Sequence, residues 1–223
     1  GSMMGFGERM TFLQRVGNTF SLGFGKLFIP YMSLPVEKLL KDKFGPDFPD
    51  LEPLLSQTSQ WFLNNEPLIE FPRPITHKII DIGGISVASG HSELTVFQTW
   101  SYILDLRKQT VLLSFGTVAK SFLMPENYKS TIREVFRKFP DVTFIWKYEK
   151  PEDKISEGIP NLIEATWVPQ NDMLYDPRLS LFITHCGQGS TTEATTAGVP
   201  LIVIPVLADQ KRNAAVCFKV LHY

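Results

Sequence analysis

The sequence predicts an α/β protein built around a parallel sheet, and three observations support that prediction. From residue 110 onward, short apolar runs typical of buried strands alternate with helical patterns, an order that gives parallel strands with helices on both faces. Helix-stop signals interrupt the alternation, as where Gly198 is followed by Pro200. Glycine and polar residues follow several strands directly. Since ligands of such sheets bind outside the carboxyl ends of the strands, we expect a ligand site at that edge.

The composition is that of an ordinary folded globular protein. The chain has 223 residues, of which 43% are hydrophobic and 20% are charged, enough for one large domain or two modest ones. A formal net charge of −1 gives no reason to expect nucleic acid or an anionic membrane surface as a partner. The two cysteines, Cys186 and Cys217, cannot form a disulfide framework. We expect Cys186 to be a small buried residue.

No segment has the pattern of a leader or a membrane anchor. The longest apolar candidate, 199–208, is shorter than the ~20 residues of a membrane helix and is interrupted by Pro200 and Pro205. The N-terminus shows no secretory hydrophobic region. We therefore expect neither a signal peptide nor a transmembrane segment within this sequence.

The first 88 residues carry weaker patterns than the rest. Apolar residues recur at about one helical turn over 10–16, which predicts an amphipathic helix. A second helix is expected over 36–44, where a Gly-Pro pair follows. Strands are expected over 59–63 and 78–82. We interpret these elements as scaffold.

From residue 110 the expected elements alternate clearly. A helix is predicted over 125–139, because Pro125 suits the first helical turn and the apolar residues fall on one face. The strands of the predicted sheet are 111–115, 142–146, 162–166, 179–184 and 201–204.

The segment 180–210 contains most of the residues that suggest chemistry. Its first strand leads directly into His185, and a helix start is expected near Ser190, with Glu193 in the first turn. The N–H groups at a helix N-terminus lack partners and the dipole there is positive, which suits an anion. Gly187 and Gly189 let the backbone approach closely, and His185 adds a donor that can become cationic. The pattern predicts an anion site.

This segment, FITHCGQGSTTEATTAGVPLIVIPVLADQ, together with Trp167-Val168-Pro169-Gln170 upstream, resembles the donor-binding signature of the UDP-glycosyltransferases. Within them it is most similar to the animal UDP-glucuronosyltransferases, in an invertebrate branch. The resemblance implies a GT-B-type fold of two facing Rossmann-like domains, both incomplete here. It implies that 1–88 is the C-terminal part of the acceptor-binding N-domain, 89–109 a linker and helix, and 110–223 the UDP-sugar donor domain, truncated at its C-terminus.

The resemblance assigns roles to the residues that match its motif. Trp167 would stack on uracil, with Gln170 near the base or ribose, and Glu193 would accept from the ribose hydroxyls. A core Trp and a surface Glu that complements the helix dipole are the alternatives. His185, Ser190 and the backbone from Gly187 would hold the diphosphate. The complete expected donor site is Ser114, Gly116, Thr117, Trp167, Gln170, His185, Gly187, Gly189, Ser190, Glu193, Asp209 and Gln210.

The turn after the first strand, Ser114-Phe115-Gly116-Thr117, is similar to the family's S-x-G-S/T turn, which approaches the phosphates. Asp209 and Gln210 would hydrogen-bond the transferred sugar. The turn 186–190 departs from the Gly-Gly-Ala-Asn-Gly of vertebrate relatives, which leaves the sugar undecided between UDP-glucuronate and UDP-glucose. Either would be a co-substrate, and the family resemblance implies no metal or other cofactor.

The implied activity is transfer of a hexose or hexuronic acid from a UDP-sugar to a small lipophilic acceptor, with inversion. In the family a His of the early N-domain, oriented by an Asp, deprotonates the acceptor. His77, His91 and His222 match no catalytic position, so we expect no catalytic residue in this chain. Its expected contribution is donor recognition.

Two alternatives to an enzyme fragment are compatible with the sequence. The chain is either part of such an enzyme, or a non-catalytic UDP-sugar-binding or regulatory isoform that pairs with full-length relatives in a homo- or hetero-oligomer, or a remnant that does not fold alone. Family members are endoplasmic-reticulum membrane proteins that face the lumen, and the resemblance implies that location for the whole protein.

Overall fold

The computed structural model describes residues 6, 10–71, 74–85, 87 and 98–220. The chain divides into two compact units. The first unit comprises Gly1–Gly83 with Ala215–Tyr223, and the second comprises Gly84–Ala214. The predicted linker 89–109 falls partly on 89–97, and His91 and His222 also lie outside the described residues; the rest of that linker contains α3 (Gln98–Leu104).

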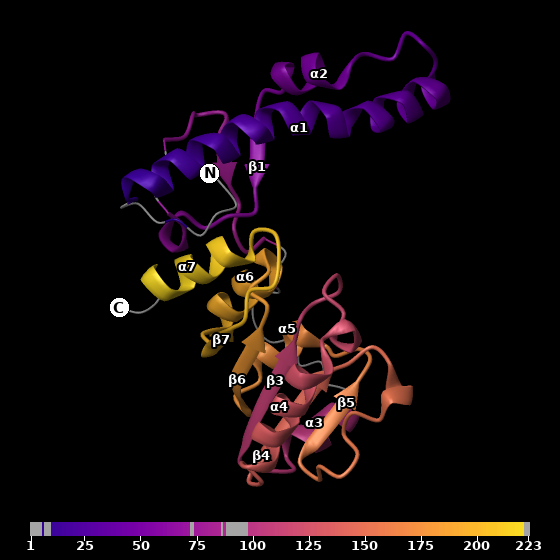
Figure 1. Cartoon of the computed structure of the whole chain (residues 1–223), viewed down its shortest axis with the longest axis vertical. Helices are drawn as coiled ribbons and strands as arrows, with labels where there is room; N and C mark the ends of the chain where they lie inside the picture. The colour runs from indigo at the N-terminus through magenta and orange to yellow at the C-terminus, as the bar shows by residue number, and fades with distance from the viewer. Residues whose placement is uncertain (1–5, 7–9, 72–73, 86, 88–97, 221–223) are drawn as a thin grey trace. The chain divides into compact units, whose positions relative to one another are not determined.

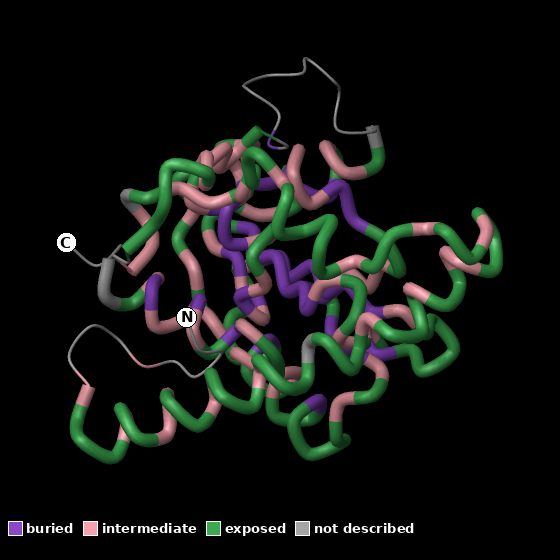
Figure 2. The backbone as a smooth tube through the Cα atoms, turned by 90° about the horizontal axis from the view of Figure 1, so that it is seen from above, coloured by how far each residue is buried: buried purple, intermediate pink, exposed green. Residues whose placement is uncertain are grey.

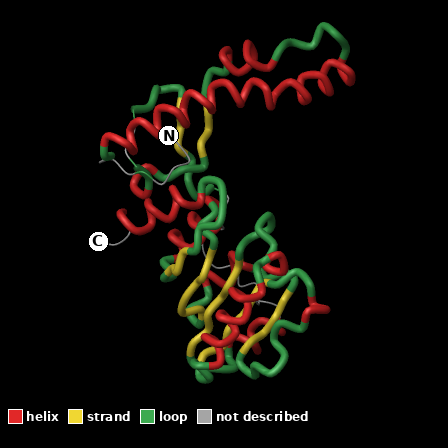
Figure 3. Tube along the Cα trace, viewed as in Figure 1, coloured by secondary structure: helices red, strands yellow, loops and turns green. Residues whose placement is uncertain are grey.

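The first unit contains a long helix and a small parallel sheet (Figures 1 and 3). Thr11 caps the long helix α1: its hydroxyl accepts from the Gln14 N–H, and the Gln14 side chain accepts from the Thr11 N–H, a capping box that satisfies donors at the helix start. The elements are α1 (Phe12–Phe44), α2 (Leu51–Gln57), β1 (Trp61–Leu63), the 3₁₀ turn η1 (Pro67–Ile69) and β2 (Ile79–Asp81), with β1 parallel to β2.

The helix α1 corrects the expectation of two separate helices over 10–16 and 36–44. It runs without interruption through its glycines and through Pro30 and Pro35. Interior Gly and Pro lower helix propensity by about 1 and 3 kcal/mol, but they do not set where the helix ends. It ends at Gly45, which has a φ of 104°. No described side chain of α1 is buried, as its green and pink trace in Figure 2 shows.

The second unit contains a five-stranded parallel sheet in the order β5-β4-β3-β6-β7. Each strand lies within two residues of its predicted bounds. Helices and 3₁₀ turns connect the strands, and two helices, α5 and α7, had no sequence prediction. The strands are β3 (Gln109–Ser114), β4 (Val142–Lys147), β5 (Leu162–Ala165), β6 (Leu179–Thr184) and β7 (Leu201–Val203). The helices and 3₁₀ turns are η2 (Ser121–Leu123), α4 (Glu126–Arg137), η3 (Pro151–Asp153), α5 (Gln170–Tyr175) and α6 (Gln188–Ala197). The last helix, α7 (Gln210–Val220), begins in this unit and its residues from Ala215 belong to the first unit.

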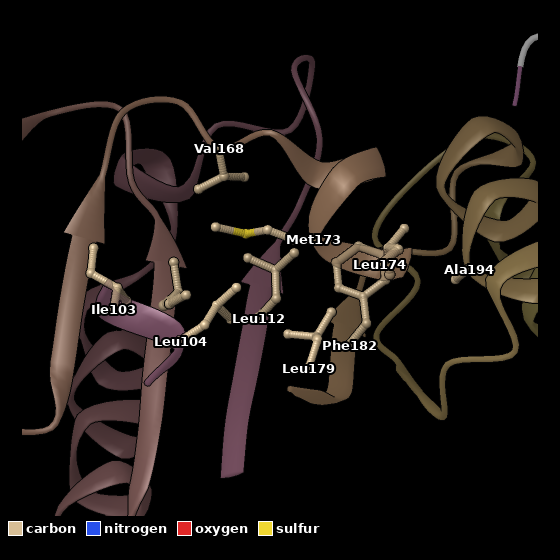
Figure 4. Packing of buried hydrophobic residues seen from close by; sticks show 10 residues of the cluster. Ile103, Leu104, Leu112, Val168, Met173, Leu174, Leu179, Phe182 and Ala194 are labelled. Carbon is tan, nitrogen blue, oxygen red and sulfur yellow. The ribbon is translucent and has the colours of Figure 1, made fainter. Parts of the chain in front are cut away.

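Both faces of this sheet are covered. On one face Leu112, Ile145 and Phe182 pack with side chains of α3, α5 and α6 (Figure 4). On the other face Val111 and Trp146, with their strand neighbours, pack against α4. Adjacent residues of β3 and β4 thus point to opposite faces, as the period of a strand requires. The near-continuous apolar runs in the sequence are explained by this two-sided burial.

The strand order places a switch point between β3 and β6. From β3 the chain proceeds outward through β4 and β5, then returns to the other side of β3 with β6 and continues to β7. In open parallel sheets the loops at such a point diverge and leave a crevice at the carboxyl ends of the two strands. The fold therefore places Ser114 and His185, which end or follow these strands, at the same crevice.

Candidate functional site

A pocket of about 360 Å³ lies at the carboxyl ends of β3, β4 and β6. Its lining includes ten of the twelve residues predicted for the donor site, all except Asp209 and Gln210. The ten are Ser114, Gly116, Thr117, Trp167, Gln170, His185, Gly187, Gly189, Ser190 and Glu193. Four further residues line the pocket without having been predicted from the sequence: Val118, Lys147, Val168 and Gln188.

The His185 ring lies between two glycines. An alanine Cβ at Gly116 would approach its Cε1 to 2.8 Å, and one at Gly187 would approach its Nε2 to 2.7 Å. Gly116 also has a φ of 77°, a conformation that L side chains rarely adopt, and its N–H donates to the Ser114 hydroxyl at 3.3 Å. A side chain at either position would therefore displace the imidazole, which lies against both the turn after β3 and the turn after β6.

Burial lowers the pKa of His185 below its ordinary value, and the nearby Asp209 carboxylate opposes this shift. The imidazole is therefore neutral near pH 7, with one N–H to donate. The next residue, Cys186, is fully buried, which confirms its predicted character, and it has a φ of 64°. Its N–H donates to the Thr184 hydroxyl at 3.3 Å. This backbone conformation directs the chain from β6 into α6.

The helix α6 begins earlier than the sequence suggested. Gly187, in an extended conformation, is its N-cap, and Gln188 is the first helical residue. Ser190 therefore lies inside the first turn, and Glu193 is the sixth residue rather than a member of that turn. The reason is that glycine serves as an N-cap without a side-chain hydrogen bond. The N–H groups of the first turn belong to residues that line the pocket, as an anion site needs.

Gln170, Ser190 and Glu193 form one hydrogen-bonded group. The Gln170 side-chain amide donates to Ser190 Oγ at 3.1 Å and to Glu193 Oε2 at 2.7 Å. Gln170 is the first residue of α5 and the other two lie on α6, so this group joins the two helices. Beside it, Trp167 is 59% exposed. An exposed indole at a pocket wall offers a flat apolar face, and the alternative of a core Trp is not what the structure shows.

Asp209 and Gln210 lie near the pocket without lining it. The Gln210 side-chain oxygen accepts from the Val206 and Leu207 N–H groups, both at 2.8 Å, and shapes the loop before α7. Asp209 Oδ2 accepts from the Asn213 side chain at 2.8 Å, and the same Asn213 amide donates to the Cys186 carbonyl at 3.0 Å. Asn213 thus ties this loop to the His185 turn, and no motif indicated it.

Lys147, unlike Asn213, has a position in the sequence pattern that indicates the site. It is the last residue of β4. Since ligands bind at the carboxyl ends of parallel strands, the reasoning that applies to Ser114 and His185 applies equally to Lys147. The predicted strand ends one residue earlier, at Trp146, and therefore does not include the lysine. Its side chain is 10% exposed and its Nζ donates to the Gly116 carbonyl at 2.7 Å.

These features define a class before any relative is considered: a parallel α/β protein whose crevice at the switch point is lined by the start of a helix and by a flat aromatic face. The family model described as UDP-glucoronosyl and UDP-glucosyl transferase matches residues 2–220. The chain belongs to this family. The fold is accordingly a fragment of the GT-B type.

Individual relatives agree with this assignment. "Putative UDP-glucuronosyltransferase ugt-47" of Caenorhabditis briggsae is 31% identical over 92% of this chain and 38% of its own length. UDP-glucuronosyltransferase 1A7 of Homo sapiens is 31% identical over 95% of this chain and 39% of its own length. The chain therefore spans less than half the length of these relatives. The solved structure of the glycotransferase of kitacinnamycin shares the fold, with a TM-score of 0.54 and 22% sequence identity. The match covers 80% of this chain and 45% of the kitacinnamycin glycotransferase chain.

Two further observations concern the described residues alone. Among them, no helix combines the length and the apolar character that crossing a membrane requires. No group of three or more His, Cys, Asp or Glu side chains in the same residues is placed to hold a metal ion. The predicted absence of a metal and of a cofactor stays a prediction.

Proposed function

We propose that this chain carries the UDP-sugar site of a glycosyltransferase that acts on small lipophilic acceptors. The observation that supports this most directly is the pocket itself, where an exposed Trp167, the Gln170–Glu193 pair and the start of α6 line one cavity. In a UDP-sugar, the flat base suits Trp167, the ribose diol suits the Gln170–Glu193 pair, and the diphosphate suits the start of α6. The relatives named above carry UDP-glucuronosyltransferase names, which supports the same ligand class.

The base and ribose are assigned to one side of the pocket. Trp167 stacks on uracil, a contact of about 1–3 kcal/mol by analogy with other base–aromatic stacks. Glu193 accepts from the ribose hydroxyls. Because Gln170 already donates to one Glu193 oxygen, it holds the carboxylate in place and directs the other oxygen to the sugar. This pairing also favours the ribose role over that of a surface carboxylate.

The diphosphate is assigned to the helix start. His185 donates one N–H as a neutral imidazole, and the Ser190 hydroxyl and the backbone N–H groups of the first turn of α6 supply further donors. Gly189 suits this role, since among the described residues outside its own stretch of α6 nothing lies within 4 Å of the position of a Cβ there. The Ser114–Thr117 turn approaches from β3.

The transferred sugar is assigned to the loop that contains Asp209. Asn213 orients that carboxylate relative to the His185 turn, while Gln210 acts chiefly by holding the loop. The sugar is glucuronate or glucose. In this proposal the isolated chain binds donor without transferring it, because neither His77 nor His185 is assigned as the general base. On the family resemblance, the whole protein belongs to the endoplasmic-reticulum membrane.

The test is nucleotide selectivity of the purified 223-residue chain. Calorimetric titration should show UDP binding more tightly than ADP, because Trp167 and Gln170 suit a single pyrimidine ring. Equal affinity for both nucleotides would overturn the base assignment, and no binding of either would overturn the function. Robust glycosyl transfer by this chain alone would show that it contains a base that we have not assigned.

A further inference from the structure

Lys147 is a buried cation within the lining of the pocket. It lies at the carboxyl end of β4 with its side chain 10% exposed. Among the described residues that line the pocket, it alone carries a permanent positive charge, since His185 is neutral near pH 7. Its function is not explained by the assignments made above.

Lys147 is one member of a small hydrogen-bonded group, which we name the latch: Lys147, Glu149 and Ser121. Lys147 Nζ donates to the Gly116 carbonyl at 2.7 Å and to Glu149 Oε1 at 3.2 Å. Glu149 Oε2 accepts from the Ser121 N–H at 2.8 Å, and Ser121 Oγ donates to the Lys147 carbonyl at 2.8 Å. The latch therefore fixes both ends of the 116–121 loop to β4.

The latch acts on the part of the loop that contacts His185. It holds the Gly116 carbonyl on one side, while on the other side Gly116 lies so close to the imidazole that a Cβ would reach 2.8 Å. A movement of Gly116 therefore changes the space available to His185. The next two residues, Thr117 and Val118, line the pocket and are exposed, so they offer little packing to hold this turn.

The buried charges also argue against a purely stabilising role. The two side chains of the Lys147–Glu149 pair are 10% and 13% exposed. Desolvation of such a pair offsets most of its attraction, and apolar replacements are often as stable. A buried pair that contributes little to stability and touches a ligand-site turn is better explained by the geometry that it imposes.

We propose that Lys147 is a positioning residue of the donor site: held by Glu149, its ammonium fixes the Gly116 turn against His185 in the arrangement that binds a diphosphate. The proposal rests on the proposed function. It differs from a simple electrostatic role, in which Lys147 would attract the diphosphate and Glu149 would only oppose it.

The experiment compares UDP with uridine on the full chain. Lys147→Met should weaken UDP binding roughly 10- to 100-fold, the range of a hydrogen bond from a charged donor. Uridine binding, measured by ligand-observed NMR, should be unchanged, because the Trp167 and Glu193 side of the pocket is not touched. Lys147→Arg keeps the charge and the donors and should give an intermediate UDP affinity. Lys150→Met is the control, since Lys150 is half-exposed and pairs with Asp153 outside the pocket.

Glu149→Gln separates positioning from electrostatics. One amide oxygen cannot replace two carboxylate oxygens that contact Lys147 and the Ser121 N–H separately. Positioning therefore predicts weaker UDP binding in this variant, even though a negative charge beside the ligand has been removed. Tighter UDP binding would overturn the proposal.

The remaining outcomes also decide the question. If Lys147→Met binds UDP as wild type does, or loses uridine and UDP equally, the positioning role is wrong. A melting curve verifies that each variant is folded. If Lys147→Met is unfolded, the UDP affinity of Glu149→Gln decides the question instead. If wild type binds no UDP, the proposed function has failed, which is a different result from failure of the latch.

Discussion

The two units differ in how far their apolar side chains are buried. In the second unit Phe182 is fully buried between the sheet and its covering helices. In the first unit Phe20, on α1, is 75% exposed, and its aromatic neighbours on that helix are similarly accessible. The difference shows that forming a helix and burying its apolar residues are separate events. Stability and ligand binding should therefore be properties of the second unit, and matched substitutions in the two units can test this.

The largest expected difference is between two identical substitutions. Phe182→Ala removes a fully buried ring and should lower the free energy of unfolding by about 3–5 kcal/mol. Phe20→Ala should change it by less than about 0.5 kcal/mol, because the ring is mostly exposed. Chemical denaturation of both variants measures the contrast. Equal losses would show that α1 is packed in solution, and the comparison would then be wrong.

Two tryptophans give the next contrast. Trp167→Ala should weaken UDP binding by about 1–3 kcal/mol through loss of stacking. Trp61, on β1 of the first unit, is 43% exposed, and Trp61→Ala should leave UDP affinity unchanged. Calorimetric titration distinguishes the two. An unaltered affinity in Trp167→Ala would refute the stacking assignment.

Glycines with positive φ sharpen the comparison further. Gly45→Ala in the first unit and Gly116→Ala in the second both place a Cβ in a strained conformation, at a cost of about 1–3 kcal/mol each. The Cβ at Gly116 would collide with His185, whereas no described residue beyond the chain neighbours lies within 4 Å of a Cβ at Gly45. Both variants should lose stability, and Gly116→Ala alone should lose UDP affinity. A parallel loss in Gly45→Ala would contradict this.

The smallest effect concerns pH. Because burial lowers the pKa of His185 below 6.5, the unfolded chain binds more protons than the folded chain just below that pH. Stability should therefore fall as the pH falls below about 6.5. His185→Gln should show a shallower decline, because the carboxylates that titrate in the same range are common to both proteins. Denaturation at several pH values compares the slopes, and identical slopes would exclude a contribution from His185.

Local patterns predicted the sheet well because each strand is a short apolar run buried on both sides. The position of the site followed from the same patterns, since ligands lie at the carboxyl ends of such strands. The local start of α6 was predicted less well: Ser190 has the stronger capping propensity, yet the extended backbone at Gly187 makes it the N-cap. Similarly, Gly and Pro suggested a break in α1 that its backbone does not have.

Long-range partners could not be predicted from the sequence. Lys147 reaches Gly116 across 31 residues, and Asn213 reaches Cys186 across 27. Neither Lys147 nor Asn213 belongs to a motif, and a lysine at the end of a strand or an asparagine within a helix can have many different partners. Their roles depend on which strands lie side by side. That information appears only when the strand order is known.

The strand order also affects the order in which the two sides of the pocket form during folding. Leu112 of β3 pairs with Ile145, 33 residues later, and with Phe182, 70 residues later. Contacts between distant residues form slowly because loop closure must precede them, and synthesis delivers β4 before β6. The β3–β4 side of the pocket, with Lys147, can therefore exist before His185 joins it. A ligand that contacts both sides should slow unfolding far more than it accelerates folding.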